Sequence, residues 1–281
     1  MHAVLPILAK DFDRVDRLLL PSLKSQAPWL TVLWIIVPGR AVAAARALFA
    51  QAGPFEIRVR SELSVVPERL VFGTWRKGWY VQQLIKMAMA EHVVGEFYLS
   101  LDCDLVCTRP TTLADFVVHG RGVLEILPGQ ERTEWYSWAE RVLRMKPASR
   151  EMGVTPALYN TAAMRGLQAY LGARCSWPVR ALAALLAVDA RSTGAWRLSL
   201  LLQLPWIEMA LYLTYLESTG LDITVHTART APALAGNNFW DRAQFEQWDP
   251  SLTFSPAASF PFSVLASSSG VTVDEVLARI N

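Results

Sequence analysis

Short apolar runs alternate with helix-forming stretches over the first sixty residues, and this alternation limits the fold more than any other feature of the sequence. Residues 3–9 and 31–37 are apolar or β-branched, and residues 55–60 alternate apolar with charged side chains. Between them, residues 13–23 carry apolar side chains at helical spacing, and residues 41–52 are rich in alanine. Strand, helix, strand, helix, strand is the order that right-handed crossovers produce in a parallel sheet. We therefore expect an α/β fold with a Rossmann-type, mostly parallel open sheet flanked by helices.

The next apolar run, residues 97–101, ends on two carboxylates, Asp102 and Asp104. Because side chains of an extended chain alternate between faces, these two carboxylates are expected to point the same way. Paired carboxylates repel each other unless a cation lies between them, and oxygen ligands suit Mg²⁺ or Mn²⁺. Ligands of open α/β sheets bind at the carboxyl ends of strands. The stretch predicts a divalent cation site; the alternative is a solvated turn at a strand end.

Composition limits the class of protein. The chain has 281 residues, of which 52% are hydrophobic and 19% charged, and a formal net charge of +2. This length and apolar content suit a single domain over residues 1–281, and the small net charge argues against a nucleic-acid partner. Residues 1–11 lack the features of a signal peptide, and three cysteines without paired spacing suggest reduced thiols, so we expect a cytoplasmic protein. The apolar residues 198–216 contain Pro205 and Glu208, which argues against a membrane span; peripheral contact with the inner face of a membrane stays open.

Two basic residues precede a predicted helix over residues 80–93. Arg76 and Lys77 are placed to neutralise a diphosphate near the amino terminus of that helix, where backbone N–H groups favour anions. The alternative is a solvated basic turn. Farther along, Trp135, Tyr136 and Trp138 offer stacking faces for a sugar ring or belong to the core.

Glu208 and His226 are the titratable residues that stand out in the second half. Glu208 lies in the apolar stretch 206–215, where burial is expected to raise its pKa and suit it as a general base, unless it forms an ion pair with a residue such as Arg197. Residues 222–226 alternate polar with apolar side chains, which predicts a strand that ends on His226. An imidazole at this place suits Mn²⁺ as a ligand, or is an ordinary histidine without a metal.

Three stretches, residues 10–25, 78–110 and 206–215, resemble GT-A-fold glycosyltransferases with an Asp-x-Asp motif, and are similar to a bacterial group of sugar transferases of polysaccharide biosynthesis. The resemblance implies a hexosyltransferase-type enzyme that uses Mn²⁺ or Mg²⁺. Such an enzyme moves a sugar from a nucleotide diphosphate sugar to a hydroxyl of a glycan or glycolipid acceptor, with inversion or retention of the anomeric centre. Residues 1–110 would then bind the nucleotide sugar, and the helical half, residues 111–281, would bind the acceptor.

The same resemblance implies roles for particular residues. It assigns the metal to Asp102, Asp104 and His226, and catalysis to Asp104 and Glu208. It assigns donor binding, beside Asp102, to Asp11, Arg76, Lys77, Gln83, Lys86 and Asn160. Two alternatives remain: a nucleotidyltransferase acting on sugar phosphates, and a catalytically inactive GT-A-like domain that binds glycans. Residues 6–11 contain no glycine, which counts against a nucleotidyltransferase loop after the first strand.

Overall fold

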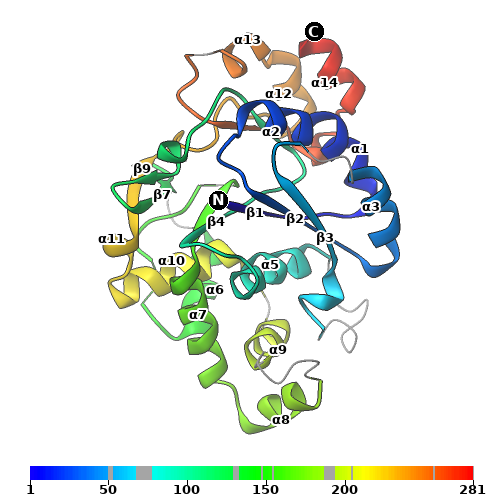
Figure 1. Ribbon diagram of the computed structural model, residues 1–281. Coiled ribbons are helices and arrows are strands. Elements are labelled where there is room, and N and C mark those ends of the chain that lie inside the picture. Colours follow the sequence, from blue (N-terminus) through cyan, green and yellow to red (C-terminus); the bar gives the residue numbers. More distant parts are fainter. Residues whose placement is uncertain are drawn as a thin grey trace.

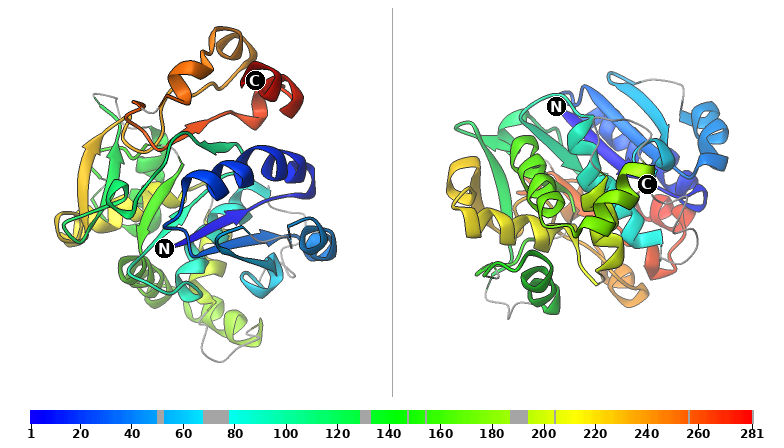
Figure 2. Two further views of the ribbon diagram at one scale, coloured as in Figure 1. Left: turned by 45° about the horizontal axis from the view of Figure 1, so that its top comes forward. Right: turned by 90° about the horizontal axis from the view of Figure 1, so that it is seen from below.

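A computed structural model of the chain describes residues 1–49, 53–67, 78–128, 133–146, 148–153, 155–186, 194–203, 205–255 and 257–280. Figure 1 shows a central sheet with helices on both of its faces, and Figure 2 shows the same arrangement from two further directions. Arg76 and Lys77, which the sequence places at the donor diphosphate, lie outside the described residues.

The central sheet has the strand order β3-β2-β1-β4-β8. The first four strands run parallel, and β8 pairs with β4 in the antiparallel direction. This mostly parallel sheet confirms the expected fold class. The strands are β1 (His2–Pro6), β2 (Val32–Val37), β3 (Glu56–Ser61), β4 (Phe97–Ser100) and β8 (Ala157–Asn160).

The position of β1 at the middle of the sheet decides where a ligand site forms. The chain leaves β1 toward β2 and β3 on one side and returns to β4 on the other, so the strand order reverses between β1 and β4. Such a reversal is the point at which open α/β sheets bind ligands, outside the carboxyl ends of the strands. The residues that follow Pro6 and Ser100 therefore face a common edge.

Side-chain alternation along the strands divides the core into two layers. On one face, Leu5 and Leu33 pack with α1 (Phe12–Arg14), α2 (Leu20–Gln26) and α3 (Val42–Phe49). On the other face, Val4 and Trp34 belong to a larger apolar cluster. That cluster also takes in α5 (Gly78–Ala88), α6 (Glu134–Leu143), α7 (Thr161–Ala173), α9 (Ala195–Leu202) and α10 (Glu208–Thr219).

The second half is largely helical and carries two small sheets. Strand β5 pairs with β10 near the carboxyl end of the chain, and β7 lies between β6 and β9. These strands are β5 (Leu105–Cys107), β6 (Val117–Val118), β7 (Arg121–Ile126), β9 (His226–Thr230) and β10 (Phe262–Val264). The remaining helices are α8 (Trp177–Leu186), α11 (Asp222–Val225), α12 (Arg242–Gln247), α13 (Pro250–Thr253) and α14 (Val273–Ile280).

The predicted strand over residues 222–226 is wrong. Residues 222–225 form a helical turn, closed by a 3.0 Å hydrogen bond from the Val225 amide to the Leu221 carbonyl, and the strand begins only at His226. Local hydrogen bonds of this kind compete with an alternating pattern that spans only five residues. The predicted break at Pro205 agrees with the structure, because α9 ends before it and α10 begins after it. Within the described ranges, none of the helices is both long and apolar enough to cross a bilayer.

Candidate active site

Asp102 lies at the carboxyl end of β4, where two side chains hold its carboxylate. The Leu101 amide donates to the Val4 carbonyl at 2.8 Å, which extends the pairing of β4 with β1 up to the aspartate. One oxygen of Asp102 lies 2.8 Å from the Lys86 ammonium, and the other accepts a 2.6 Å hydrogen bond from the Thr155 hydroxyl. Because 34% of the Asp102 side chain stays exposed, this carboxylate reaches the protein surface while both oxygens have partners.

Asp104 lies two residues on and is held by the carboxyl-terminal part of the chain. The Ser267 amide donates to its carboxylate at 3.1 Å, and the Leu265 amide donates to its main-chain carbonyl at 2.7 Å. Burial and the nearby charge of Asp102 raise the pKa of Asp104, although the Ser267 amide and Arg14 act in the opposite direction. Burial and the like charge of Asp102 thus outweigh the stabilisation that the Ser267 amide and Arg14 give to the ionised form of Asp104.

Lys86 joins the surface of the site to a buried carboxylate. Its side chain is 2% exposed and reaches from α5 to Asp102 and, at 3.6 Å, to Glu208, the first residue of α10, which has no exposed surface. Burial opposes the charged form of Lys86, but the Asp102 and Glu208 carboxylates outweigh this effect and its pKa is raised. Lys86 therefore carries a buried positive charge shared between two acids.

Glu208 is surrounded by polar groups inside the core. The Tyr159 hydroxyl donates to it at 3.3 Å, and the Gln83 amide donates to it when its nitrogen is oriented toward the carboxylate. Burial raises the pKa of Glu208, and the Lys86 charge acts against that rise. The sequence left open an ion pair between Glu208 and a residue such as Arg197. The structure has an ion pair at Glu208, but its partner is Lys86, and the guanidinium of Arg197 lies 3.6 Å from Glu91. The Glu208 carboxylate has no surface that is accessible to solvent.

Asp11 approaches the same edge of the sheet from β1. It ends a 3-10 turn over Ala9–Asp11 and accepts a 3.2 Å hydrogen bond from the Leu8 amide. Burial, together with the charges of Asp104, Asp11 and Asp102, raises the pKa of the Cys103 thiol, and Arg14 opposes them. The three aspartates therefore gather around Cys103, as the topology of the sheet predicts.

The charges of this edge suit a divalent cation. Four carboxylates, those of Asp11, Asp102, Asp104 and Glu208, lie near two cations, Lys86 and Arg14, in the described part of the site. A divalent cation would balance this excess, and the donors at Asp102 and Asp104 are oxygens, which Mg²⁺ and Mn²⁺ prefer. No group of three or more His, Cys, Asp or Glu side chains among the described residues is arranged to hold a metal ion. Asp102 and Asp104 supply two carboxylates, so a cation held by them would need further ligands to complete its shell.

The structure does not bring His226 to this edge. Its ring contacts Phe97 at the start of β4, the end opposite to Asp102, and both ring nitrogens have partners. One nitrogen lies 2.8 Å from the Tyr212 hydroxyl and the other 3.0 Å from the Gly122 carbonyl, and burial lowers the pKa of His226 to about 4. The expectation that His226 completes the metal shell with the two aspartates is therefore not supported, because its position is set by pairing between β7 and β9.

Asn160 also lies away from the expected donor site. It pairs with Phe97 across β8 and β4, and its side chain accepts a 2.9 Å hydrogen bond from the Ala163 amide as the cap of α7. Because β8 runs antiparallel to β4, the end of β8 coincides with the start of β4. Asn160 is thus a structural residue at the far edge of the sheet.

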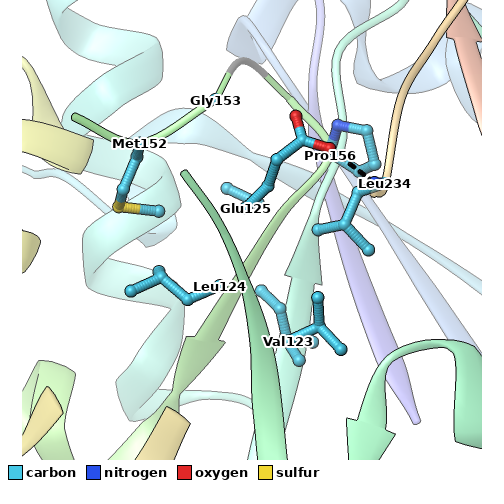
Figure 3. Close-up of a pocket in the computed structure, with 9 residues that line it drawn as sticks. Val123, Leu124, Glu125, Met152, Gly153, Pro156 and Leu234 are labelled. Atoms are coloured by element: carbon cyan, nitrogen blue, oxygen red, sulfur yellow. Dashed lines mark hydrogen bonds between the residues drawn. The ribbon is translucent and has the colours of Figure 1, made fainter. Parts of the chain in front are cut away.

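The loop that carries Thr155 is fixed by a contact with β7. The Gly153 amide donates to the Glu125 carbonyl at 2.9 Å, and a Cβ atom at Gly153 would overlap the Glu125 carboxylate. That carboxylate is buried and accepts hydrogen bonds from the amides of Ala233, at 2.6 Å, and Leu234, at 2.5 Å. Figure 3 shows Glu125, Gly153 and Leu234 among the residues that line a small, mainly apolar pocket, with the Glu125 carboxylate turned toward Pro156 and Leu234. The pocket therefore lies where the segment around Gly153 packs against β7, and this packing places Thr155 against Asp102.

Sequence reasoning did not identify Thr155 as a partner of Asp102, nor Arg14 and Ser267 as neighbours of Asp104. Arg14 is 7% exposed and donates to the carbonyls of Leu265 and Val271, at 2.6 and 2.8 Å. Because these contacts join residues about 250 positions apart, no local pattern in the sequence predicts them.

Two of three comparisons with known proteins gave matches. A family described as a family of unknown function (DUF6492) matches residues 1–281. No curated protein matches the chain. Among solved structures, mouse xyloside xylosyltransferase 1 in its apo form is similar, with a TM-score of 0.50 and 12% identity over 96% of this chain and 99% of that chain. The galactosyltransferase LgtC in complex with donor and acceptor sugar analogs aligns with a TM-score of 0.47 and 12% identity over 98% of this chain and 91% of that chain.

Proposed function

The chain belongs to the family of unknown function DUF6492, and we propose that it is a glycosyltransferase that uses a nucleotide diphosphate sugar and a divalent cation. The observation that carries the proposal is the pair of aspartates, Asp102 and Asp104, that follows β4 at the point where the strand order reverses. A diphosphate bound there would add further negative charge, which a cation can bridge to the carboxylates. The xylosyltransferase with a similar fold supports sugar transfer as the class of reaction.

Asp102 and Asp104 would hold Mn²⁺ or Mg²⁺. When bound, such an ion stabilises negative charge on the leaving diphosphate. Thr155 and Lys86 orient the Asp102 carboxylate, and the Ser267 amide orients that of Asp104. Asp11, at the end of β1, would lie toward the nucleoside.

Glu208 acts through Lys86 in this proposal. A general base has to come within hydrogen-bond reach of the acceptor hydroxyl, and a side chain with no exposed surface does not meet that condition. Glu208 instead keeps Lys86 charged and directed at Asp102, with Gln83 and Tyr159 as its own supports. In place of the predicted role as a general base, Glu208 is thus proposed to position Lys86.

A glycan or glycolipid hydroxyl is the acceptor that we propose, and partly exposed aromatic rings support this choice. Trp79 is 39% exposed, and its ring lies 5.6 Å from that of Trp135, which is half-buried. Aromatic faces of this kind stack on sugar rings. Tyr136, in contrast, is buried and accepts a 2.8 Å hydrogen bond from the Met152 amide, so it belongs to the core.

The proposal is tested by the release of free nucleotide from a panel of nucleotide diphosphate sugars, with Mn²⁺ and with EDTA. We expect release with at least one donor, loss of release with EDTA, and loss in Asp104→Asn. Asp274→Asn is a matched control, because it removes an exposed carboxylate whose side chain is 79% exposed. Full activity of Asp104→Asn would refute the assignment. Pyrophosphate formation from a nucleoside triphosphate and a sugar phosphate would indicate a nucleotidyltransferase instead.

A further inference from the structure

An exposed tryptophan begins helix α8 at one end of the molecule. Trp177 is 75% exposed, whereas two other apolar side chains of α8, Val179 and Leu182, pack against a small cluster that includes Leu198. Figures 1 and 2 show α8 at the end of the molecule opposite to α14. We call residues 173–180 the α8 tip. A large apolar ring that stays exposed on a helix whose other apolar side chains pack inward suggests an external contact.

The charges beside Trp177 are all of one sign. Arg174 and Arg180 are exposed on either side of it, and the guanidinium of Arg174 lies 5.3 Å from the Tyr170 ring, which keeps it near the start of α8. Residues 173–180 contain these two arginines and no acidic residue. Because the net charge of the whole chain is only +2, this basic character is local to the α8 tip.

The geometry points to an anionic membrane surface as the partner of the α8 tip. Trp177 and Arg180 are three residues apart and lie on one face of the helix, so an indole and a guanidinium can meet a lipid surface together. Tryptophan is suited to the boundary between acyl chains and headgroups, and arginine to the anionic headgroups. We propose that α8 lies in this boundary and attaches the protein reversibly to the membrane.

A second copy of the chain is a less suitable partner for the same surface. A two-fold symmetric contact through the α8 tip would place identical patches against each other. Arg174 and Arg180 of one copy would then face those of the other, and like charges repel. An anionic surface has the complementary charge and needs no pocket to receive Trp177.

The proposal does not depend on catalysis and is tested with the full chain and no nucleotide sugar. We would measure co-sedimentation with phosphatidylcholine vesicles and with vesicles that also contain phosphatidylglycerol. We expect binding to the anionic vesicles that weakens with added salt. Trp177→Ala should weaken it by about tenfold, and each of Arg174→Gln and Arg180→Gln by about fivefold.

Two controls separate the α8 tip from other exposed groups. Trp240→Ala removes another exposed tryptophan, 45% accessible and outside α8, and should leave binding unchanged. Arg174→Lys and Arg180→Lys should retain binding, since they keep the charge. Equal binding of Trp177→Ala and wild type, no binding of wild type to anionic vesicles, or dimers in lipid-free solution that Trp177→Ala abolishes would each overturn the proposal.

Discussion

Replacing Lys86 by methionine is expected to destabilise the protein by about 3–5 kcal/mol at neutral pH, because the buried Glu208 carboxylate loses its cation. Glu208 has no exposed surface and depends on Lys86, 3.6 Å away, for charge compensation. Asp102 also loses a partner, but it is 34% exposed and water can solvate it. Nearly all of the cost should therefore come from Glu208.

The destabilisation by Lys86→Met should change with pH in a direction that can be checked. Burial already raises the pKa of Glu208, and removal of the opposing Lys86 charge should raise it further. A carboxyl group whose pKa is higher in the folded chain than in the unfolded chain binds its proton more tightly when folded. Its contribution to stability is therefore present at low pH and lost as the pH rises through the folded-state pKa. The destabilisation by Lys86→Met should be smaller at pH 5 than at pH 8.

Guanidinium unfolding, followed by circular dichroism at both pH values, measures these differences in the free energy of unfolding. Glu208→Gln should cost less than Lys86→Met, because Lys86 keeps Asp102 as its partner. The double variant Lys86→Met/Glu208→Gln should recover more than half of the loss, since it leaves no unpaired buried charge. The reasoning fails if Lys86→Met costs less than about 1 kcal/mol at pH 8, or if the double variant is no more stable than Lys86→Met.

Substitutions at three other positions test the cation site and the structural histidine separately. Mn²⁺ at about 100 times its dissociation constant should stabilise wild type by about 2.7 kcal/mol, and Asp104→Asn much less, in a thermal-shift assay. Because the pKa of Asp104 is raised, the Mn²⁺ effect should fade on acidification at a higher pH than for an ordinary aspartate; an unchanged shift in Asp104→Asn would contradict the site. Thr155→Val removes a hydrogen bond to the partly exposed Asp102 and should lower the free energy of unfolding by about 1 kcal/mol in urea titrations, a loss absent if that hydrogen bond does not form in solution. The pKa of His226 is lowered to about 4, so the unfolded chain binds the proton more tightly and stability should fall by about 3 kcal/mol as the pH drops from 6.5 through 4. His226→Gln should lack that part of the slope in urea titrations at several pH values, and an identical slope would contradict it.

The first sixty residues show how far local sequence patterns predict the structure. Alternating apolar strands and amphipathic helices over residues 3–60 predicted β1, β2, β3 and the helices between them, because each element buries one face or one stripe that is visible in its own sequence. The strand ending on Asp102 and Asp104 was recognisable for the same reason. Once the strand order is parallel, Asp11 and Asp102 must approach a common edge, and they do.

Two of the residues that the resemblance assigned to the site do not lie at this edge of the sheet. His226 and Asn160 lie at the start of β4, and their places depend on the pairing of β9 with β7 and on the antiparallel direction of β8. Periodicity shows which face of a strand is buried, but it does not show which strand lies beside it or in which direction it runs. Two polar residues assigned to the site were therefore separated from it by topology.

The amino-acid sequence by itself determined the α/β class, the elements of the first half and the pair of acids at the end of β4, since these depend on side chains near one another along the chain. Only the tertiary structure decided that Lys86 connects Asp102 to Glu208, that Thr155 orients Asp102, and that the carboxyl-terminal segment binds Asp104. Those contacts join different helices, strands and loops, up to 163 positions apart in the sequence, and the buried charges of Lys86 and Glu208 require partners wherever the packed elements can supply them.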